Sequence, residues 1–249
     1  MIDLTNTRTM VVGGSSGIGF EIAQRVVRLG GHVHLAARGE EKLRAAQARL
    51  AHPELSHMHS VDMQDDAAVA ALFDELDDVA LDHLVITASS AVHGPFAEVP
   101  VSDVIAMFAS KFFGPYRLAK AALPTLADGA SVTFFSGVLS RRPGMNTSGL
   151  GAVNAAIEGL TRGLALELGP KVRVNCCSPG MARTEAYAHL SEEAREEMYR
   201  ATGESLPLGR VGLPGEIADT VLMMMASTFM TGRVVDVDGG HMVRQYATR

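Results

Sequence analysis

Residues 9–19 read TMVVGGSSGIG, and this stretch decides the fold. It begins as a short apolar run with β propensity and ends where an amphipathic helix starts, so its glycines lie in the turn between a strand and a helix. Such glycines let the backbone bend tightly and approach a pyrophosphate, while the N–H groups of the helix N-terminus favour an anion. The residues expected to form this phosphate loop are Gly13, Ser15, Ser16, Gly17, Ile18 and Gly19.

A glycine-rich string taken alone also fits a βα turn that binds nothing, so the surrounding sequence has to decide. Short β-type runs alternate with helix-length segments, which is typical of βαβ units that build a parallel sheet. Strands are predicted at Thr9–Val12, His32–Ala37, His57–Val61, His83–Thr87, Ser131–Ser136, Val172–Cys177 and Arg233–Val237. Helices are predicted at Gly17–Leu29, Glu40–Leu50, Asp66–Leu76, Ser102–Leu126, Leu150–Leu168 and Pro214–Ala226. This context favours a nucleotide-binding, doubly wound α/β Rossmann-type fold with helices on both faces.

The organisation of the chain is simple apart from one segment. No repeat, charge run or low-complexity linker divides it, so residues 1–249 are expected to form one domain. Residues 181–210 break the alternation after the sixth strand and contain their own helical stretch, Ser191–Arg200. A long insertion at the carboxyl end of a strand is where a substrate lid would lie.

The composition narrows the possible partners. With 22 Lys and Arg against 28 Asp and Glu, the formal net charge is -6, which gives no basic field for a nucleic-acid backbone. The adjacent Cys176 and Cys177 lie in an apolar run, which suggests buried thiols in a reducing compartment. The sequence has no secretory leader pattern and no run of membrane-spanning length, so a cytoplasmic protein without a membrane partner is expected. The histidines form no recognised metal pattern, so no metal site is expected.

Two positions beyond the phosphate loop bear on the choice of dinucleotide. The second predicted strand is followed by Arg38, where a carboxylate would pair with the ribose hydroxyls of NAD and an arginine can neutralise the 2′-phosphate of NADP. Arg38 therefore favours NADP(H) over NAD(H), the alternative being that it merely opens a solvated helix. Asp62, after the third strand, either hydrogen-bonds the adenine amino group or caps the next turn.

Together these motifs resemble the short-chain dehydrogenase/reductase family over essentially the whole chain. The resemblance rests on residues 13–19, Asp62, Arg173-Val-Asn leading into Ser178-Pro-Gly, Thr184 and the ending Val237-Asp-Gly-Gly. It implies a seven-stranded parallel sheet in the order 3-2-1-4-5-6-7 and a homotetramer, with a homodimer as the alternative. It also implies that the cofactor site includes Met63, Ala88, Lys111, Asn154, Pro179, Gly180 and Thr184.

The residues that perform catalysis in that family are replaced here. The family uses a serine, a tyrosine, a lysine four residues after the tyrosine, and an asparagine in the preceding long helix. Matching residues 154–160 and 110–114 to the family places Asn154 at the lysine, Leu150 at the tyrosine, Gly137 at the serine and Lys111 at the asparagine. The tyrosine mechanism therefore cannot run in this chain.

Asparagine and lysine have exchanged places rather than vanished. One hypothesis is that the swap keeps a cationic, hydrogen-bonding floor under the cofactor, with Lys111 as proton donor if burial lowers its pKa. The alternative is a solvated Lys111 and a helix-packing Asn154. Ser136, beside Gly137, is the third catalytic candidate. Further donors could be Ser89, Ser90, His93, Ser148 and Tyr187.

The sequence thus predicts an NADP(H)-dependent oxidoreductase with an atypical site, acting on a small molecule with a carbonyl/alcohol pair or an activated C=C bond. The loss of Ser, Tyr and Lys together keeps a second hypothesis open, a catalytically inactive NADP(H)-binding sensor or scaffold. Hydride turnover that depends on Lys111 separates the two.

Overall fold

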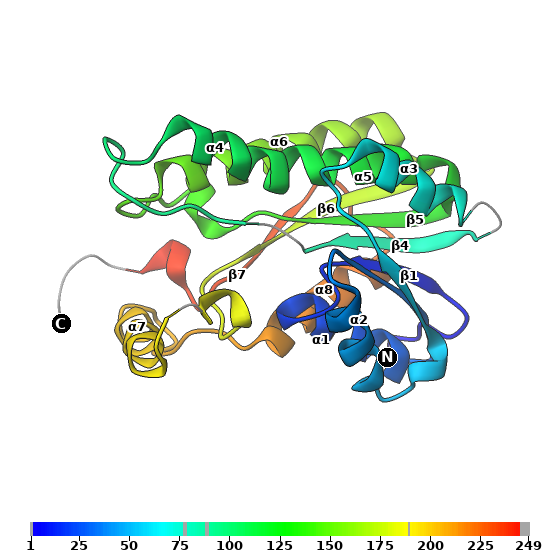
Figure 1. Cartoon of the computed structure of the whole chain (residues 1–249), viewed down its shortest axis with the longest axis horizontal. Coiled ribbons are helices and arrows are strands. Elements are labelled where there is room, and N and C mark those ends of the chain that lie inside the picture. The colour runs from blue at the N-terminus through cyan, green and yellow to red at the C-terminus, as the bar shows by residue number, and fades with distance from the viewer. Residues whose placement is uncertain (1, 77–78, 88–89, 189, 245–249) are drawn as a thin grey trace.

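Seven parallel strands form the centre of the molecule in the order β3-β2-β1-β4-β5-β6-β7, as the family resemblance predicts (Figure 1). The computed structural model describes residues 2–76, 79–87, 90–188 and 190–244. The strands are β1 (Arg8–Val12), β2 (His32–Ala37), β3 (Ser56–Ser60), β4 (Leu81–Ile86), β5 (Leu126–Phe135), β6 (Val172–Pro179) and β7 (Val234–Val237). All of them except β5 begin within two residues of the predicted start.

Helices cover both faces of this sheet, as expected. One face carries α1 (Gly17–Arg28), α2 (Glu40–Ala48) and α8 (Pro214–Ala226), and the other carries α3 (Asp66–Asp74), α4 (Val101–Phe108), α5 (Gly114–Ala122) and α6 (Ser148–Leu168) (Figure 1). Each face has its own apolar core. Cys176 belongs to one core and Cys177 to the other, because successive side chains of a strand point to opposite faces. Both cysteines are buried free thiols.

The order of the strands reverses at β1. β1 pairs with β2 on one side and with β4 on the other, both in parallel. The chain therefore moves outward through β2 and β3 and then returns across β1 to β4. In doubly wound sheets, ligands bind outside the carboxyl ends of the strands at such a reversal.

The long helix predicted at Ser102–Leu126 is wrong as a single element. After α4 the chain forms a π-helical turn, η2 (Ala109–Phe113), then α5 and a 3₁₀ turn, η3 (Leu123–Thr125). Pro115 explains the interruption, because proline has no N–H to donate to the carbonyl of Lys111 one helical turn earlier. Leu126 already belongs to β5, so that strand starts earlier than the predicted Ser131.

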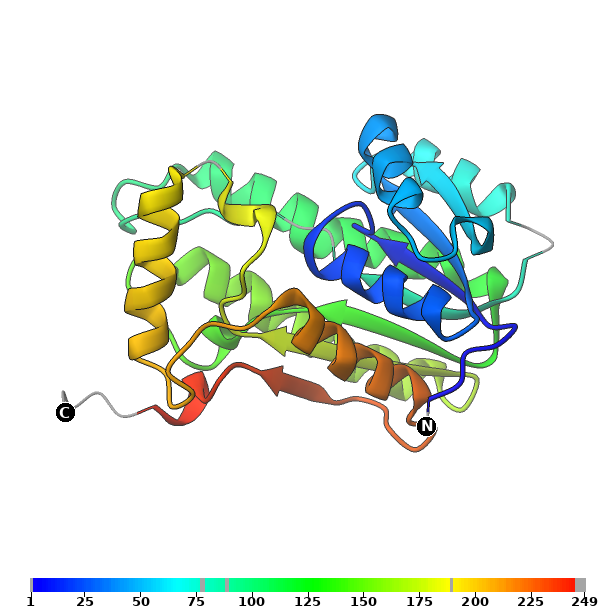
Figure 2. The ribbon, with the colours of Figure 1, turned by 90° about the horizontal axis from the view of Figure 1, so that it is seen from below.

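The segment after β6 contains a 3₁₀ turn, η5 (Glu185–Tyr187), and α7 (Glu192–Glu204). The helix predicted at Ser191–Arg200 is thus present, beginning one residue later and ending four residues later, at Glu204. Ser191 is its N-cap, and the hydroxyl oxygen accepts the N–H of Ala194 at 3.2 Å. Figure 2 shows α7, and the turn η6 (His241–Val243), beyond the carboxyl ends of the strands. Among the described helices, none combines the length and apolarity that crossing a membrane requires.

Candidate active site

The phosphate loop joins β1 to α1 and is shaped by its glycines. Gly13 and Gly17 have φ of 86° and 52°, in the left-handed region that suits glycine. A Cβ at Gly19 would overlap the carbonyl oxygen of Gly13, so this close approach also requires glycine. The N-cap Ser16 makes no side-chain cap and the first turn of α1 contains no acidic residue. The backbone N–H groups from Ser16 to Ile18 are therefore left for an anion.

The start of the segment after β6 lies against this loop. A Cβ at Gly17 would be 3.5 Å from Cβ of Thr184 and 3.4 Å from a carboxylate oxygen of Glu185. The hydroxyl of Tyr199 in α7 lies 3.4 Å from the carbonyl oxygen of Thr184 and connects α7 to the same segment. Thr184 is thus next to the phosphate loop. The sequence did not point to its neighbour Glu185.

The positions after β2 and β3 have different environments. Arg38 is exposed, and within the described part of the chain no carboxylate forms an ion pair with it. Asp62 accepts the N–H of Gln64 at 3.0 Å, so it caps the turn before α3, as its second interpretation held. Met63 is buried, and its carbonyl oxygen accepts a hydrogen bond from Arg117 at 2.9 Å. Ala88 and Ser89 lie outside the described residues.

Lys111 lies in the π-helical turn η2 and is buried. The residue is 7% exposed, and its Nζ is 3.5 Å from the carbonyl oxygen of Ser136, just after β5. Burial lowers the pKa of Lys111 to about 8, and the nearby Cys176 acts in the opposite direction. The alternative of a solvated lysine is therefore wrong. An amine that titrates this close to neutral pH can give and take protons.

Asn154 faces the same region from α6. It is 2% exposed, and within the described ranges its Oδ1 has no hydrogen-bond partner. A Cβ at Gly137 would lie 3.0 Å from Nδ2 of Asn154 and 3.7 Å from the carbonyl oxygen of Pro179. The amide thus fills space that a larger side chain at Gly137 would need. Leu150 is buried in a small apolar cluster with Met107 and Val153.

A hydrogen-bonded network that the sequence analysis did not single out lies behind Ser136. Oε1 of the buried Glu158 accepts the hydroxyls of Ser136 at 3.2 Å and of Ser140 at 2.5 Å. Its Oε2 is 3.5 Å from Nε of Arg141, which follows the 3₁₀ turn η4 (Val138–Ser140) and also pairs with Asp236 on β7. The hydroxyl proton of Ser136 is therefore engaged by a carboxylate.

Gly180 adds a second place where backbones meet closely. It follows Pro179, the last residue of β6, and its N–H donates to the carbonyl oxygen of Val237 at 3.0 Å. A Cβ at Gly180 would lie 2.9 Å from Cα of Asp238. Glycine is thus required where the end of β6 passes the end of β7.

Comparison with known proteins decides the family. A family model described as Enoyl-(Acyl carrier protein) reductase matches residues 12–242. The chain is 31% identical over 244 residues to Short-chain dehydrogenase/reductase ATR9 of Stachybotrys chlorohalonatus, covering 93% of this chain and 95% of that protein. It is 30% identical to Short-chain dehydrogenase/reductase ucsE of Acremonium sp, covering 94% of each. The chain belongs to the short-chain dehydrogenase/reductase family.

Solved structures agree with this assignment. A small-chain dehydrogenase in complex with NADPH is 37% identical to this short-chain dehydrogenase/reductase, with a TM-score of 0.82 over 94% of this chain and 98% of the other. MalC Reductase/Diels-Alderase from Malbranchea aurantiaca is 26% identical, with a TM-score of 0.89 over 97% and 98% of the two chains. The protein is therefore a member of a family of oxidoreductases.

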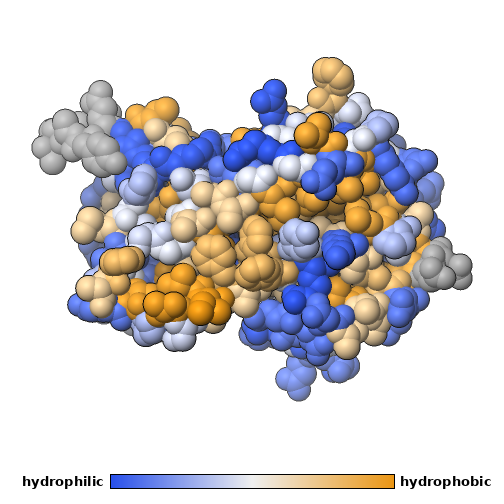
Figure 3. Space-filling view, turned by 90° about the horizontal axis from the view of Figure 1, so that it is seen from above, coloured by the Kyte–Doolittle hydropathy of each residue, from blue (hydrophilic) through white to orange (hydrophobic). Residues whose placement is uncertain are grey.

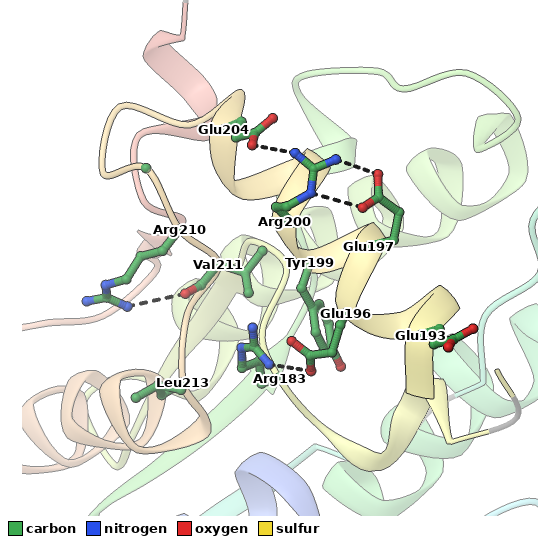
Figure 4. Close-up of a pocket in the computed structure, with 11 residues that line it drawn as sticks. Arg183, Glu193, Glu196, Glu197, Tyr199, Arg200, Glu204, Arg210, Val211 and Leu213 are labelled. Atoms are coloured by element: carbon green, nitrogen blue, oxygen red, sulfur yellow. Dashed lines mark hydrogen bonds and ion pairs between the residues drawn. The ribbon is translucent and has the colours of Figure 1, made fainter. Parts of the chain in front are cut away.

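A cavity of this short-chain dehydrogenase/reductase lies away from Lys111, Asn154 and Ser136. It has a volume of about 770 Å³ between α7 and the segment that leads into α8 (Figure 4). Its rim consists of arginine–glutamate pairs, including Arg183–Glu196 at 2.6 Å and Arg200–Glu204 at 2.6 Å. Lys111, Asn154 and Ser136 do not line it, so this cavity does not mark the candidate active site.

Several other candidate proton donors, and the histidines, contact neighbouring side chains in this short-chain dehydrogenase/reductase. Oγ of Ser90 is 2.5 Å from Oγ of Ser110, and the Tyr187 ring packs edge-on against Tyr199. The rings of His34 and His59 stack, with Nδ1 and Nε2 3.0 Å apart. Among the described residues, no group of three His, Cys, Asp or Glu side chains is arranged to hold a metal ion.

Proposed function

We propose that this protein is an NADP(H)-dependent oxidoreductase in which Lys111 replaces the family tyrosine as proton donor. The observation that carries the proposal is a buried amine whose pKa is lowered to about 8 by burial, beside the position where the family serine is replaced by Gly137. The substrates we propose are small molecules with a carbonyl/alcohol pair or an activated C=C bond. Bound NADPH would supply the hydride.

The fit of the dinucleotide is supported by two features of the described residues. The glycine-shaped loop leaves the N–H groups at the start of α1 available for a pyrophosphate. The unpartnered, buried Oδ1 of Asn154 needs a hydrogen-bond donor, and a ribose hydroxyl is one. The exposed Arg38 supports NADP(H) over NAD(H), because its guanidinium can pair with a 2′-phosphate.

In this proposal the chain's own residues handle the proton. Lys111 donates a proton from Nζ to the substrate oxygen as negative charge develops there, and its neutral amine is reprotonated before the next turnover. In the reverse direction the neutral amine accepts that proton. Asn154 holds the cofactor with its amide. Ser136 anchors Nζ through its carbonyl oxygen rather than donating a proton, since its hydroxyl is bonded to Glu158.

We further propose that residues 181–210 act as a substrate lid on a single domain of residues 1–249. The contact of Thr184 with the phosphate loop supports this, since closing the segment would cover the bound dinucleotide. The buried free thiols Cys176 and Cys177 support a reducing compartment such as the cytoplasm.

A homotetramer, or at least a homodimer, is also part of the proposal. Figure 3 shows apolar residues spread over the face that α4, α5 and α6 form. Large apolar side chains exposed on these helices and the turn between them are Val101, Ile105, Phe113, Tyr116 and Leu166. An exposed apolar face of this kind is typical of subunit contacts.

Calorimetric titration of the protein with NADPH and with NADH tests the cofactor. We expect tighter binding of NADPH, and Arg38→Ala should weaken NADPH binding about tenfold or more while leaving NADH unchanged. Arg44→Ala is the matched control, because Arg44 is an exposed arginine of α2 already paired with Glu40 at 2.6 Å. Absence of NADPH binding at all would overturn the proposal.

A screen of ketones and enones, followed by the loss of NADPH absorbance, tests the chemistry. Lys111→Ala should abolish turnover, and Lys120→Ala, an exposed lysine of α5, should not. NADPH binding without turnover of any substrate by the wild type would favour the sensor or scaffold.

A further inference from the structure

Glu158 is a buried acid with a complete set of partners. It is 4% exposed, and burying a carboxylate is unfavourable unless hydrogen bonds and a cation replace the lost water. Here Oε1 accepts two serine hydroxyls, and Oε2 is 3.5 Å from Nε of Arg141. An apolar side chain at this position of α6 would pack without that cost. The presence of a fully partnered carboxylate therefore points to a role beyond packing.

Ser136 connects this carboxylate to Lys111. Its hydroxyl donates to Glu158 at 3.2 Å, and its backbone carbonyl oxygen is 3.5 Å from Nζ of Lys111. The two charged groups thus contact opposite parts of one residue. At an effective dielectric constant of about 20, opposite charges on the order of 10 Å apart favour the protonated amine by about one pKa unit.

We propose that Glu158 is the positioning residue of Lys111: its carboxylate fixes Ser136 and supplies the negative charge that keeps the buried amine protonated. This inference rests on the proposed role of Lys111 as proton donor. Burial alone favours the neutral amine, which cannot donate a proton. A negative charge behind Ser136 opposes that effect without occupying the space in front of Nζ, where substrate has to bind.

Other titratable groups around the pair do not supply this charge. Cys176 on β6 contacts Ser136 and opposes the fall in the Lys111 pKa, but burial raises the pKa of its own thiol to about 11, so it carries negative charge only well above pH 8. Arg141 lies between Glu158 and Asp236 of β7, so the two carboxylates share one cation. Glu158 is therefore the anion that shares a contact residue with Lys111.

NMR titration of the free protein tests the proposal directly. The chain has four lysines, and Lys42, Lys120 and Lys171 are exposed, so the ε-carbon signal of Lys111 can be followed separately in lysine-labelled protein. Loss of one signal in Lys111→Met assigns it. We expect a midpoint near pH 8 in the wild type and one about one pH unit lower in Glu158→Gln.

Two further variants separate charge from packing. Glu158→Asp changes the packing but keeps the charge, so its midpoint should return to within a few tenths of a unit of the wild type. Glu167→Gln removes an exposed carboxylate from the same helix and should leave the midpoint unchanged. If Glu158→Gln shifts the thermal unfolding temperature while the Lys111 midpoint stays in place, Glu158 is only structural and the proposal is wrong.

A milder variant keeps the test decisive if Glu158→Gln does not fold. Asp236 has a side chain 29% exposed on the edge strand β7 and shares Arg141 with Glu158. Asp236→Asn leaves Arg141 to pair with Glu158 alone, which should lower the Lys111 midpoint by a few tenths of a unit. In that case an unchanged midpoint overturns the proposal. The titration needs neither cofactor nor substrate, so its failure is distinguishable from a failure to bind NADPH in the calorimeter.

Discussion

The phosphate loop and the proposed catalytic wall lie at the same end of the sheet but are built from different groups. The loop, residues 13–19, presents backbone N–H groups, and its shape depends on side chains being absent. The proposed catalytic wall, which we define as Lys111, Ser136, Gly137, Leu150 and Asn154, presents side chains at every position except Gly137. In our proposal the loop keeps the family pattern while the wall departs from it. A backbone site is preserved by geometry alone, whereas a side-chain site can exchange its chemistry on an unchanged fold.

The most severe test of the loop is Gly19→Ala. The added methyl group would overlap the carbonyl oxygen of Gly13, and backbone cannot move aside without opening the turn. We expect unfolding free energy to fall by about 3 kcal/mol and NADPH binding to be lost. Gly39→Ala is the control, because a Cβ there meets nothing closer than 3.9 Å. Unchanged NADPH affinity in Gly19→Ala would break the idea of a backbone-built site.

Lys111→Met makes the matching test of the wall. The folded protein loses the Lys111 proton near pH 8 and the unfolded chain near 10.5, so the unfolded state binds more protons between these values and stability rises with pH across that window. Below pH 8 the whole cost of burying the protonated amine lowers the stability of the folded protein. The variant should therefore be more stable by about 2 to 3 kcal/mol at pH 7, and the difference should shrink towards pH 10.5.

Denaturant unfolding at pH 7 and at pH 10 measures this difference. Lys120→Met, on the exposed side of α5, should give no comparable gain. A destabilised Lys111→Met at pH 7 would contradict the view that the wall holds an amine at the expense of stability.

Gly137→Ser restores one family residue and sharpens the comparison. Its Cβ would lie 3.0 Å from Nδ2 of Asn154, so the amide has to shift. We expect a loss of about 1 kcal/mol in stability and of severalfold in NADPH affinity. The double variant Gly137→Ser/Asn154→Ala should relieve the crowding, so a double-mutant cycle should be non-additive. Additive effects would mean that Gly137 and Asn154 are not coupled.

The smallest effect concerns the contact between lid and loop. Glu185 places a carboxylate oxygen 3.4 Å from the Cβ position of Gly17, where a pyrophosphate would approach. Removing that charge with Glu185→Gln should raise NADPH affinity about two- to fivefold, more at low salt than at high salt. Glu193→Gln, on α7, serves as the control. An affinity that falls instead would show that Glu185 assists cofactor binding.

The loop and the wall also differ in how well the sequence predicts them. Residues 13–19 act through local geometry, which the glycine spacing specifies, and the strands around them follow from β-rich apolar runs. The burial of Lys111 depends on the π-helical turn, and in residues 102–122 only the Gly114-Pro115 pair signals that the helix is interrupted. The exchange of Asn154 and Lys111 is visible in the sequence, but the direction in which each side chain points is not.

Glu158 shows a second limit of prediction from a single sequence. It lies between Ile157 and Gly159 in an otherwise apolar and small-residue stretch of α6, and this position is the signal that the sequence offers for a special role. Its partners come from residues 136–141 and, through Arg141, from β7, which are remote in the chain. Single-sequence patterns carry no information on such long-range pairing. Asp62 was left with two roles for the same reason, and only the fold reveals its turn contact with Gln64.

The π-helical turn η2 makes the position of Lys111 sensitive to chain length. One residue more than an α-helix would need is accommodated between α4 and α5, and the faces of both helices that carry Met107 and Leu118 still reach the core. Deleting a single residue from 109–113 would close the turn into continuous α-helix, and residues in it would rotate by about 100° about the axis. Insertion or deletion of one codon can thus turn the Lys111 side chain into or out of the interior. A point substitution can replace the lysine but cannot rotate its position in this way.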